Sequence, residues 1–420
     1  MKKKRFIIIM FEKHLLSFYL FNKKGSKIEL IATSNIRIIR NSFNFSISEY
    51  ILDYLSLWGK ELGIKLTKEN VPILDQRENE GVSDIYFFAP KRNEDLKMIS
   101  KKIMLINDDI QQEGVKNVRK LLDFNNLLYV SLGSLETSMV RYFQKGVNTM
   151  KVIVEKKDLH MRKYLKDEDL LDSLKKVSKV NGQDDLIDMF TNVVHVPIFN
   201  IEDKDGAMLE YFLNELRLRS FKNCSKLKLS SFGIGDVNEN LLIIGGERQR
   251  FIGNDSLEVL SILDNLDLKG NFSVYIDKYG MFDVFQRFKK QYFTNDFYKS
   301  FSLEFWGSVV VIEGNNKAKK DEIVADVDVL ETESEKQIIP MFGRLVMFDV
   351  DDEADIELKT RDKSYIGNGK KQTTMEIKDY SGKFVIDARR RPIQNDKCDL
   401  VDVENVSEVT NWFKNLSIVK

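Results

Sequence analysis

The stretch Leu127–Met139, LLYVSLGSLETSM, decides the fold that we expect for this chain. Its apolar half is short enough for a buried strand, and Gly133 ends the apolar run. Thr137–Phe143 reads as the next strand, and the turn Gln144–Gly146 leads to a third strand over Met150–Glu155. The order strand, tight loop, strand, glycine turn, strand therefore predicts an antiparallel three-stranded unit.

The N-terminus carries the same pattern of strands and turns. Phe6–Phe11 and Leu15–Phe21 are strand-like, Lys23–Ser26 is a turn, and Lys27–Thr33 alternates as a returning strand. A helical pattern follows over Ser48–Leu62. The two copies share almost no identical residues, so the repeat is one of topology. It predicts a duplicated α/β fold with a cleft between the halves.

Composition excludes several classes of protein. The chain has 65 Lys+Arg and 65 Asp+Glu, and a net charge of zero argues against a general nucleic-acid binder. Two cysteines, Cys224 and Cys398, cannot form a disulfide framework, which favours a reducing, cytoplasmic compartment. No apolar run approaches the ~20 residues of a transmembrane helix, and the basic N-terminus leads into a strand rather than a signal peptide.

Further strands alternate with helices after the second copy. Asn240–Ile244 ends on Gly245-Gly246, and Phe272–Ile276 and Ser308–Glu313 follow, a pattern that indicates a mainly parallel sheet. The remainder is a polar stretch, then strand patterns, then a helical pattern over Val403–Leu416. The expected domains are a first α/β lobe at 1–126, a second at 127–313, a charged connector at 314–337, and a small β-domain plus C-terminal helix at 338–420.

Two glycine-containing turns are candidates for phosphate binding. Glycine and small hydroxyl residues in such turns let backbone N–H groups point at a phosphate with no Cβ in the way. Ordinary turn chemistry explains either stretch equally well when it is taken alone. The candidate nucleotide-binding residues are Gly133, Ser134, Thr137, Gly245 and Gly246.

The order of these pieces resembles the actin, sugar-kinase and heat-shock-chaperone ATPase superfamily. More specifically, the chain resembles a divergent, shortened form of the MutL-like family associated with glutamate mutase. The matching stretches are Leu127–Met139, Asp158–Arg162, Leu242–Gly246, Leu260–Gly280 and Val385–Pro392. The resemblance implies duplicated actin-like ATPase (ribonuclease-H-like) lobes, with ATP as the cofactor, followed here by the small β-domain and terminal helix.

The chain departs from that family at the positions that serve catalysis. The resemblance places Met10 where the family has an aspartate that holds Mg²⁺, Glu12 where it has glycine, and Ser17 where it has lysine. In the second loop, Ser131 and Ser138 replace two aspartates. Because a magnesium site needs oxygen ligands, usually one or two carboxylates, we expect no magnesium or other metal site and a loss of hydrolysis.

Other carboxylates are candidate replacements for the missing acids. Glu136, beside the Gly-Ser loop, is the only catalytic candidate, as a general base or metal ligand, while Asp84, Asp236 and Asp277 lie near strand ends. Exposed loop carboxylates are ordinarily solvated, so a structural role is the simpler interpretation for each.

The basic run Arg389–Arg391 has two interpretations. It could bind an anion or an acidic partner, or it could cap the small β-domain and pair with Asp387. Local pairing of this kind is common, which favours the second interpretation.

Three functions remain open from the sequence. The first is a pseudo-ATPase that acts as a scaffold or regulatory partner. The second is an active ATP-dependent factor that reactivates or loads a cobalamin-dependent mutase. The third is an actin-like cytoplasmic subunit of a pilus or secretion assembly, for which fold analogy is a weak warrant. The expected partner is accordingly a protein, either a mutase-like enzyme or a membrane-assembly protein, and not a nucleic acid.

Overall fold

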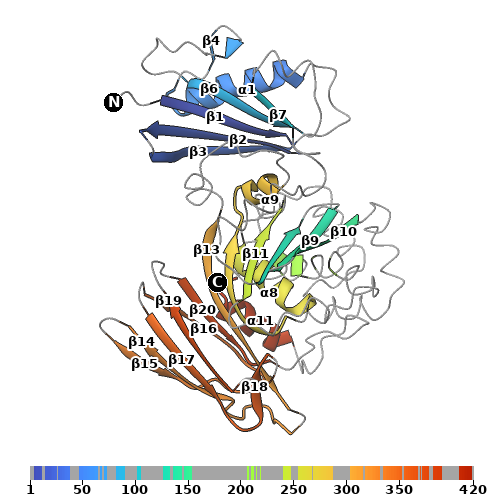
Figure 1. Ribbon diagram of the computed structural model, residues 1–420, viewed down its shortest axis with the longest axis vertical. Coiled ribbons are helices and arrows are strands. Elements are labelled where there is room, and N and C mark those ends of the chain that lie inside the picture. Colours follow the sequence, from blue (N-terminus) through green and yellow to red (C-terminus); the bar gives the residue numbers. More distant parts are fainter. Residues whose placement is uncertain are drawn as a thin grey trace. The chain divides into compact units, whose positions relative to one another are not determined.

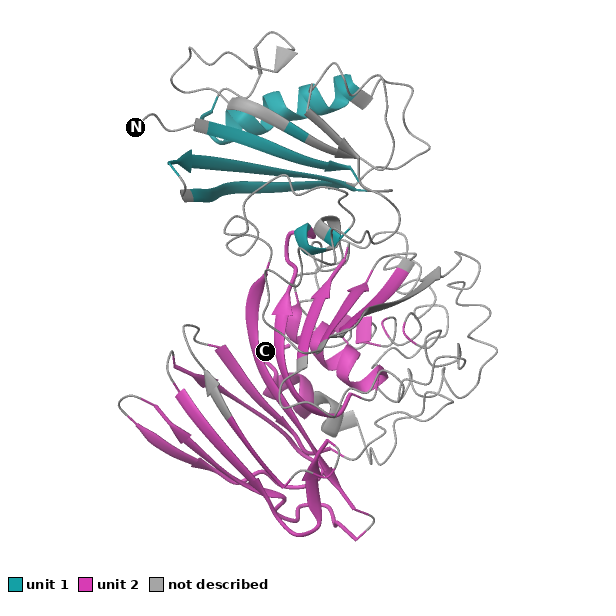
Figure 2. Cartoon of the chain, viewed as in Figure 1, with its two compact units in different colours: residues 1–122, 281–301 teal, residues 123–280, 302–420 magenta. Residues whose placement is uncertain are grey.

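In a computed structural model, the chain is described over residues 4–11, 15–25, 27–37, 47–64, 67–68, 71–72, 82–89, 102–105, 126–132, 136–143, 146–153, 206–207, 210–211, 214, 218, 240–246, 254–266, 268–286, 303–315, 317–331, 334–351, 354–367, 369, 371–377, 382–389 and 406–418. Contacts divide the chain into two compact units, residues 1–122 with 281–301 and residues 123–280 with 302–420 (Figure 2). No helix in the described ranges is long and apolar enough to cross a membrane.

The first unit is a five-stranded sheet with one helix packed on it (Figure 1). The order is β3-β2-β1-β6-β7, with β2 antiparallel to both β1 and β3, and with β1, β6 and β7 mutually parallel. The elements are β1 (Lys4–Phe11), β2 (Leu15–Lys24), β3 (Lys27–Arg37), α1 (Ile47–Glu61), the short pair β4 (Thr67–Lys68) and β5 (Val71–Pro72), β6 (Val82–Ala89), β7 (Lys102–Leu105) and α9 (Met281–Gln286).

Helix α1 confirms the helical pattern predicted near Ser48–Leu62. Ile51, Leu55 and Trp58 recur at helical spacing, and all three are buried against the face of β1 and β2 that carries Ile7 and Phe18. This apolar stripe determines which face of the sheet the helix covers.

The second unit repeats the sheet and extends it. Its nine-stranded sheet runs β10-β9-β8-β11-β12-β13-β20-β16, with β18 paired to β13, and a four-stranded sheet runs β15-β14-β17-β19. The elements are β8 (Asn126–Leu132), β9 (Glu136–Phe143), β10 (Gly146–Ile153), β11 (Asn240–Gly245), α8 (Asp255–Asn265), β12 (Gly270–Ile276), β13 (Glu304–Gly314), β14 (Ala325–Leu330), β15 (Glu335–Ile338), β16 (Leu345–Val350), β17 (Ala354–Thr360), β18 (Ser364–Ile366), β19 (Gln372–Ile377), β20 (Gly382–Asp387) and α11 (Val406–Asn415).

The expected duplication is present in strand order and in register. The first five strands of the larger sheet, β10-β9-β8-β11-β12, correspond one by one to β3-β2-β1-β6-β7. Met10 lies opposite Ser17 in the first hairpin, and Ser131 lies opposite Ser138 in the second, at the same distance from the connecting loop. The fold is thus a duplicated α/β fold, as predicted, although the two copies have almost no identical residues at matching positions.

Strands β13 and β20 are buried on both faces. Val309, Val311 and Val385 face the core that α8 and α11 cover, while Val310 and Ile386 face a second core under the four-stranded sheet. Burial on both faces explains why these strands read as continuous apolar runs instead of alternating. Strands β16 and β20, which fall within the predicted small β-domain, are part of the nine-stranded sheet.

The structure differs from the charged connector expected over 314–337. This stretch contains β14 and most of β15. Val327 and Val329 point into the core, while Asp326 and Asp328, which alternate with them, are half-buried on the other face. A strand in a sheet with one solvated face needs only alternating apolar and polar residues. The high charge of 314–337 is therefore compatible with strands, although its composition is that of a connector.

A buried charged cluster joins four distant parts of the second unit. The Arg389 guanidinium donates Nη2–H bonds to Asp264 Oδ1 at 2.7 Å and to Asp387 Oδ2 at 2.8 Å. Tyr211 Oη donates to Asp264 Oδ2 at 2.6 Å, and the Trp412 ring centroid lies 4.5 Å from the guanidinium carbon. Arg389 is 1% exposed and both aspartates are 0% exposed. The predicted pairing of Arg389 with Asp387 is confirmed.

The charges in this cluster support one another. Burial by itself lowers the pKa of the Arg389 guanidinium, but the charges of Asp264 and Asp387 raise it, and the net shift is upward. The guanidinium therefore stays charged, and it is the cation that keeps two buried carboxylates stable.

We expect Arg389→Met to destabilise the protein by about 3–5 kcal/mol, because the substitution leaves buried carboxylates without a cation. Arg344→Met is the matched control, since Arg344 pairs with Asp321 at 2.8 Å but its side chain is 59% exposed. Urea unfolding of the full chain measures both variants. Equal unfolding midpoints for the two variants would contradict the role given to the cluster.

Candidate functional site

Thr137, Gly245 and Gly246, the predicted site residues that the structure describes, lie at one edge of the nine-stranded sheet. Strands β8, β11 and β12 are mutually parallel, so their carboxyl ends lie side by side. Thr137 lies across from Leu132 at the end of β8, Gly245 ends β11, and Asp277 directly follows β12. In open α/β sheets, ligands bind outside the carboxyl ends of the strands, so this edge is the candidate site.

Gly246, in the second predicted turn, packs against Leu132, the residue that precedes the first predicted turn. Its φ is +111°, and a Cβ there would lie 2.3 Å from the Leu132 carbonyl oxygen and 2.6 Å from the Leu132 nitrogen. Leu132 is also the cross-strand partner of Thr137. The end of β11 therefore packs directly on the end of β8, and glycine is required there for close backbone packing.

Gly245 is equally constrained by its neighbours. A Cβ would lie 2.8 Å from Tyr129 Oη and 2.9 Å from Asp277 Cβ. Asp277 is fully buried, and its backbone N–H donates to the Ile244 carbonyl oxygen at 2.7 Å. Of the candidate carboxylates, Asp277 and Glu136 lie at this edge, and the side chain of Asp277 is the one that is described. Asp236 falls outside the described residues, and Asp84 lies within β6.

Thr137 has an unusual environment. Its side chain is 0% exposed, and its Oγ1 has no hydrogen-bond partner within the described part of the chain. A buried hydroxyl without a partner costs free energy, and a bound phosphate or water molecule would supply the missing bond. Gly133 and Ser134 lie outside the described residues. Glu136 begins β9 opposite Ile153, and its side chain is not described.

The corresponding edge of the first sheet has different chemistry. Register equates Met10 with Ser131, and it equates Phe88 of β6 with Gly245 of β11. Met10 and Ser17 are both 0% exposed. The first unit therefore has large apolar residues where the second has small or polar ones. Glu12 lies outside the described residues.

The donor set fits a phosphate better than a metal. Within the described ranges, no three His, Cys, Asp or Glu residues are grouped so that they could hold a metal ion. Mg²⁺ prefers oxygen ligands, and a thioether such as that of Met10 is a soft ligand that does not replace a carboxylate. The carboxyl edge of the nine-stranded sheet, called the second edge below, offers a hydroxyl and backbone groups, which suit phosphate oxygens.

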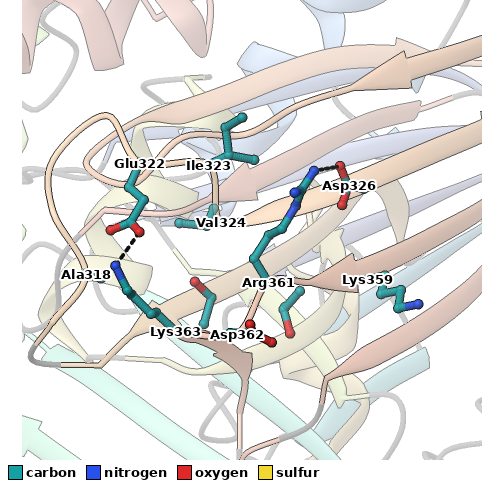
Figure 3. Close-up of a pocket in the computed structure, with 11 residues that line it drawn as sticks. Ala318, Glu322, Ile323, Val324, Asp326, Lys359, Arg361, Asp362 and Lys363 are labelled. Atoms are coloured by element: carbon teal, nitrogen blue, oxygen red, sulfur yellow. Dashed lines mark hydrogen bonds and ion pairs between the residues drawn. The ribbon is translucent and has the colours of Figure 1, made fainter.

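A separate surface cavity of about 660 Å³ opens beside the four-stranded sheet (Figure 3). Four of its charged residues pair within the wall: Arg361 Nη2 lies 2.6 Å from Asp326 Oδ1, and Lys363 Nζ lies 2.5 Å from Glu322 Oε1. The Lys363 ammonium lowers the pKa of the Glu322 carboxyl. No sequence pattern indicates this cavity, because its residues come from the segment before β14, from β14 itself, and from β17 with the turn into β18, which meet only in the fold.

The basic run is only partly described. Arg389 is the buried cation of the cluster with Asp264 and Asp387, whereas Arg390 and Arg391 lie outside the described residues. Sequence reasoning missed Asp264, since 125 residues separate it from Arg389 and no local pattern links the two.

No protein-family model and no curated protein sequence matches this chain. Among solved structures, it is similar to the ethanolamine utilization protein EutJ from Carboxydothermus hydrogenoformans, with 8% identity, a TM-score of 0.33, and coverage of 67% of this chain and 88% of that one. It is also similar to hexokinase from Schistosoma mansoni complexed with glucose (10%, 0.34, 68% and 85%) and to an Aquifex aeolicus PPX-GPPA enzyme (11%, 0.26, 57% and 68%). At these TM-scores, the fold assignment rests on the strand order and register described above.

We expect Gly246→Ala to destabilise the protein by about 2–4 kcal/mol, because backbone strain at positive φ adds to a clash with Leu132. Gly369→Ala is the control, since Gly369 has φ +85° but a Cβ there would meet nothing within 4 Å. The control should cost about 1–2 kcal/mol from the backbone alone. Thermal unfolding of both variants measures the difference, and equal losses would contradict the packing role of Gly246.

Proposed function

We propose that this chain is a pseudo-ATPase of the actin-like superfamily that acts as a scaffold or regulatory partner. One observation carries the proposal. At the paired strand ends that correspond in the two copies, Met10 faces Ser17 and Ser131 faces Ser138, so none of these four positions holds a carboxylate. Met10 and Ser17 are also fully buried.

The physical reason concerns magnesium and charge. Hydrolysis of a nucleoside triphosphate relies on Mg²⁺ to neutralise the charge that develops on the phosphates. Mg²⁺ is held in proteins by one or two carboxylates together with water and phosphate oxygens. Without acids at these four positions, the chain lacks the carboxylates that the resemblance would use to position the ion, while both sheets keep their strand order.

ATP is the cofactor to test at the second edge. Thr137 contributes a buried hydroxyl, and Gly245 and Gly246 keep Cβ atoms away from the ends of β8 and β12. Any nucleotide held there would depend on backbone and hydroxyl groups of the second unit and would not depend on a metal.

We expect purified protein to show no Mg²⁺-dependent ATP turnover and no Mg²⁺-dependent gain in thermal stability with ATP. The measurement is thermal unfolding against ATP concentration, with Mg²⁺ and with EDTA, beside a phosphate-release assay. A ligand at 100 times its Kd stabilises by about 2.7 kcal/mol, so binding is readily detected. Turnover near 1 s⁻¹ with Mg²⁺, at the low end for enzymes, would overturn the proposal.

The second candidate is an active ATPase that reactivates or loads a cobalamin-dependent mutase. The small and polar residues kept at the second edge, Ser131, Gly245 and Asp277, favour it over a fully decayed site. On this alternative, Glu136 or a neighbouring residue must replace the missing acids.

Glu136→Ala would then abolish turnover, whereas Glu136→Gln, which keeps the side-chain shape, would separate a lost charge from lost packing. We expect instead that neither substitution changes the basal rate. A selective loss in both variants would show an active ATPase that depends on Glu136, and would contradict the pseudo-ATPase proposal.

A scaffold needs a contact surface, and the four-stranded sheet supplies one. Along β17, Asp355, Glu357 and Lys359 are exposed on the outer face, between residues buried in the core. Pull-down with the full chain distinguishes the proposed partners: a mutase-like enzyme supports a role beside that enzyme, while a membrane-assembly protein supports the pilus or secretion role.

A further inference from the structure

The cavity beside the four-stranded sheet has the size and the charged wall of a ligand-binding site (Figure 3). Its volume of about 660 Å³ lies within the range of small-molecule pockets. The wall is formed by residues between 318 and 364, from the segment before β14, from β14 itself, and from β17 with the turn into β18. The cavity therefore shares no residue with the second edge.

Three cationic side chains line the wall at alternate positions of one stretch. Lys359 is exposed near the end of β17, and Arg361 and Lys363 follow it. Arg361 donates from Nη2 to Asp326 Oδ1 at 2.6 Å, and Lys363 donates from Nζ to Glu322 Oε1 at 2.5 Å. Each bond uses one donor, whereas an arginine has five N–H donors and a lysine has three. Both paired cations therefore keep donors for a ligand.

The acceptors of the same wall are largely occupied. The Lys371 ammonium donates to three main-chain carbonyl oxygens of the turn, those of Arg361, Asp362 and Ser364, at 3.2, 2.9 and 2.6 Å. Glu322 accepts on both carboxylate oxygens, on Oε1 from Lys363 and on Oε2 from the Lys319 backbone N–H. A wall with spare donors and few spare acceptors suits an anion better than a cation.

Ser364 adds a neutral donor to the wall. It lines the cavity and is 1% exposed, and its hydroxyl has no hydrogen-bond partner among the described residues. Its backbone N–H donates to the Arg361 carbonyl oxygen at 2.9 Å, so the turn is held from within as well as by Lys371. Lys317 and Lys319, on either side of the lining residue Ala318, are exposed and add positive charge nearby.

We propose that this cavity binds a phosphate group, free or carried by a small compound, through Arg361, Lys363 and Ser364. A phosphate monoester offers three acceptor oxygens and close to two negative charges near neutral pH. Three oxygens pointing in different directions can accept from donors on separate residues, and the charge suits the cations around the cavity. The volume leaves room for the rest of a small molecule.

Calorimetric titration of the full chain with inorganic phosphate and with glycerol 3-phosphate, at constant ionic strength, tests the proposal. We expect a Kd below about 1 mM for at least one of the two probes. Tighter binding of glycerol 3-phosphate would identify a phosphorylated compound as the ligand class, and tighter binding of inorganic phosphate would identify free phosphate.

Two substitutions should weaken binding of the better probe. Arg361→Gln and Lys363→Gln each remove charge-assisted hydrogen bonds and should raise the Kd about tenfold or more. Their side chains are 53% and 42% exposed, so the fold should tolerate both changes. Arg344→Gln is the matched control, because it removes a cation that pairs with Asp321 outside the wall, and its Kd should stay within about twofold of the wild-type value.

Two other substitutions should strengthen binding. Glu322→Gln removes the carboxylate that pairs with Lys363. Asp362→Asn removes the carboxylate of the wall that has no ion-pair partner among the described residues. Each should lower the Kd about threefold or more, because a nearby negative charge no longer repels the phosphate. A purely structural role for these residues predicts no such gain.

Three results would overturn the proposal. The first is no binding of either probe up to about 10 mM. The second is equal weakening in Arg344→Gln, which would show a general effect of charge. The third is tighter binding of sulfate or of a single-stranded oligonucleotide than of either probe.

ATP also carries phosphate groups, so it is titrated into Arg361→Gln and Lys363→Gln as well. ATP binding that persists in both variants belongs outside the cavity, which keeps this proposal separate from the proposed function. Thermal unfolding of each variant without ligand establishes that the fold is intact.

Discussion

The hydrogen-bonded cluster of Arg389 with Asp264 and Asp387 is the interaction on which the second unit depends. It joins α8, the end of β20, the helical residue Tyr211 and Trp412 of α11, which lie far apart in the sequence. Burial of three charges is costly unless each is paired and hydrogen-bonded. The cluster therefore forms only when all four parts are in place, which makes it a device for specificity as much as for stability.

The two sheets show how one topology carries two different chemistries. Both place a hairpin and two parallel strands in the same order, and Met10 and Ser131 occupy the same register position. Packing requirements at the sheet centre are met by many apolar residues, so the copies could diverge while keeping the fold. At the carboxyl edge, the first copy has Met10 and Phe88 where the second has Ser131 and Gly245, and the absence of carboxylates from the paired positions of both copies motivates the pseudo-ATPase proposal.

The glycines at the second edge fit two explanations, phosphate binding and close packing of strands. Gly246 resembles a phosphate-binding glycine in the sequence, yet the space a Cβ would fill is already taken by the Leu132 backbone. Close strand packing alone explains this glycine. The Thr137 hydroxyl, by contrast, is buried without a hydrogen-bond partner in the described chain, and nothing in the sequence distinguishes that threonine from others in strands.

Local patterns in the sequence determined the hairpins, helix α1, the C-terminal helix and the strand before Gly245, because hydrophobic period and turn residues act over a few positions. They also determined the pairing of Arg389 with Asp387, two residues away. Only the tertiary structure decided that β20 lies beside β13, that 314–337 forms strands and that Asp264 completes the charged cluster. Strand neighbours and buried ion pairs depend on contacts between distant segments, and a charged strand with one buried face has the composition of a loop until its partner is known.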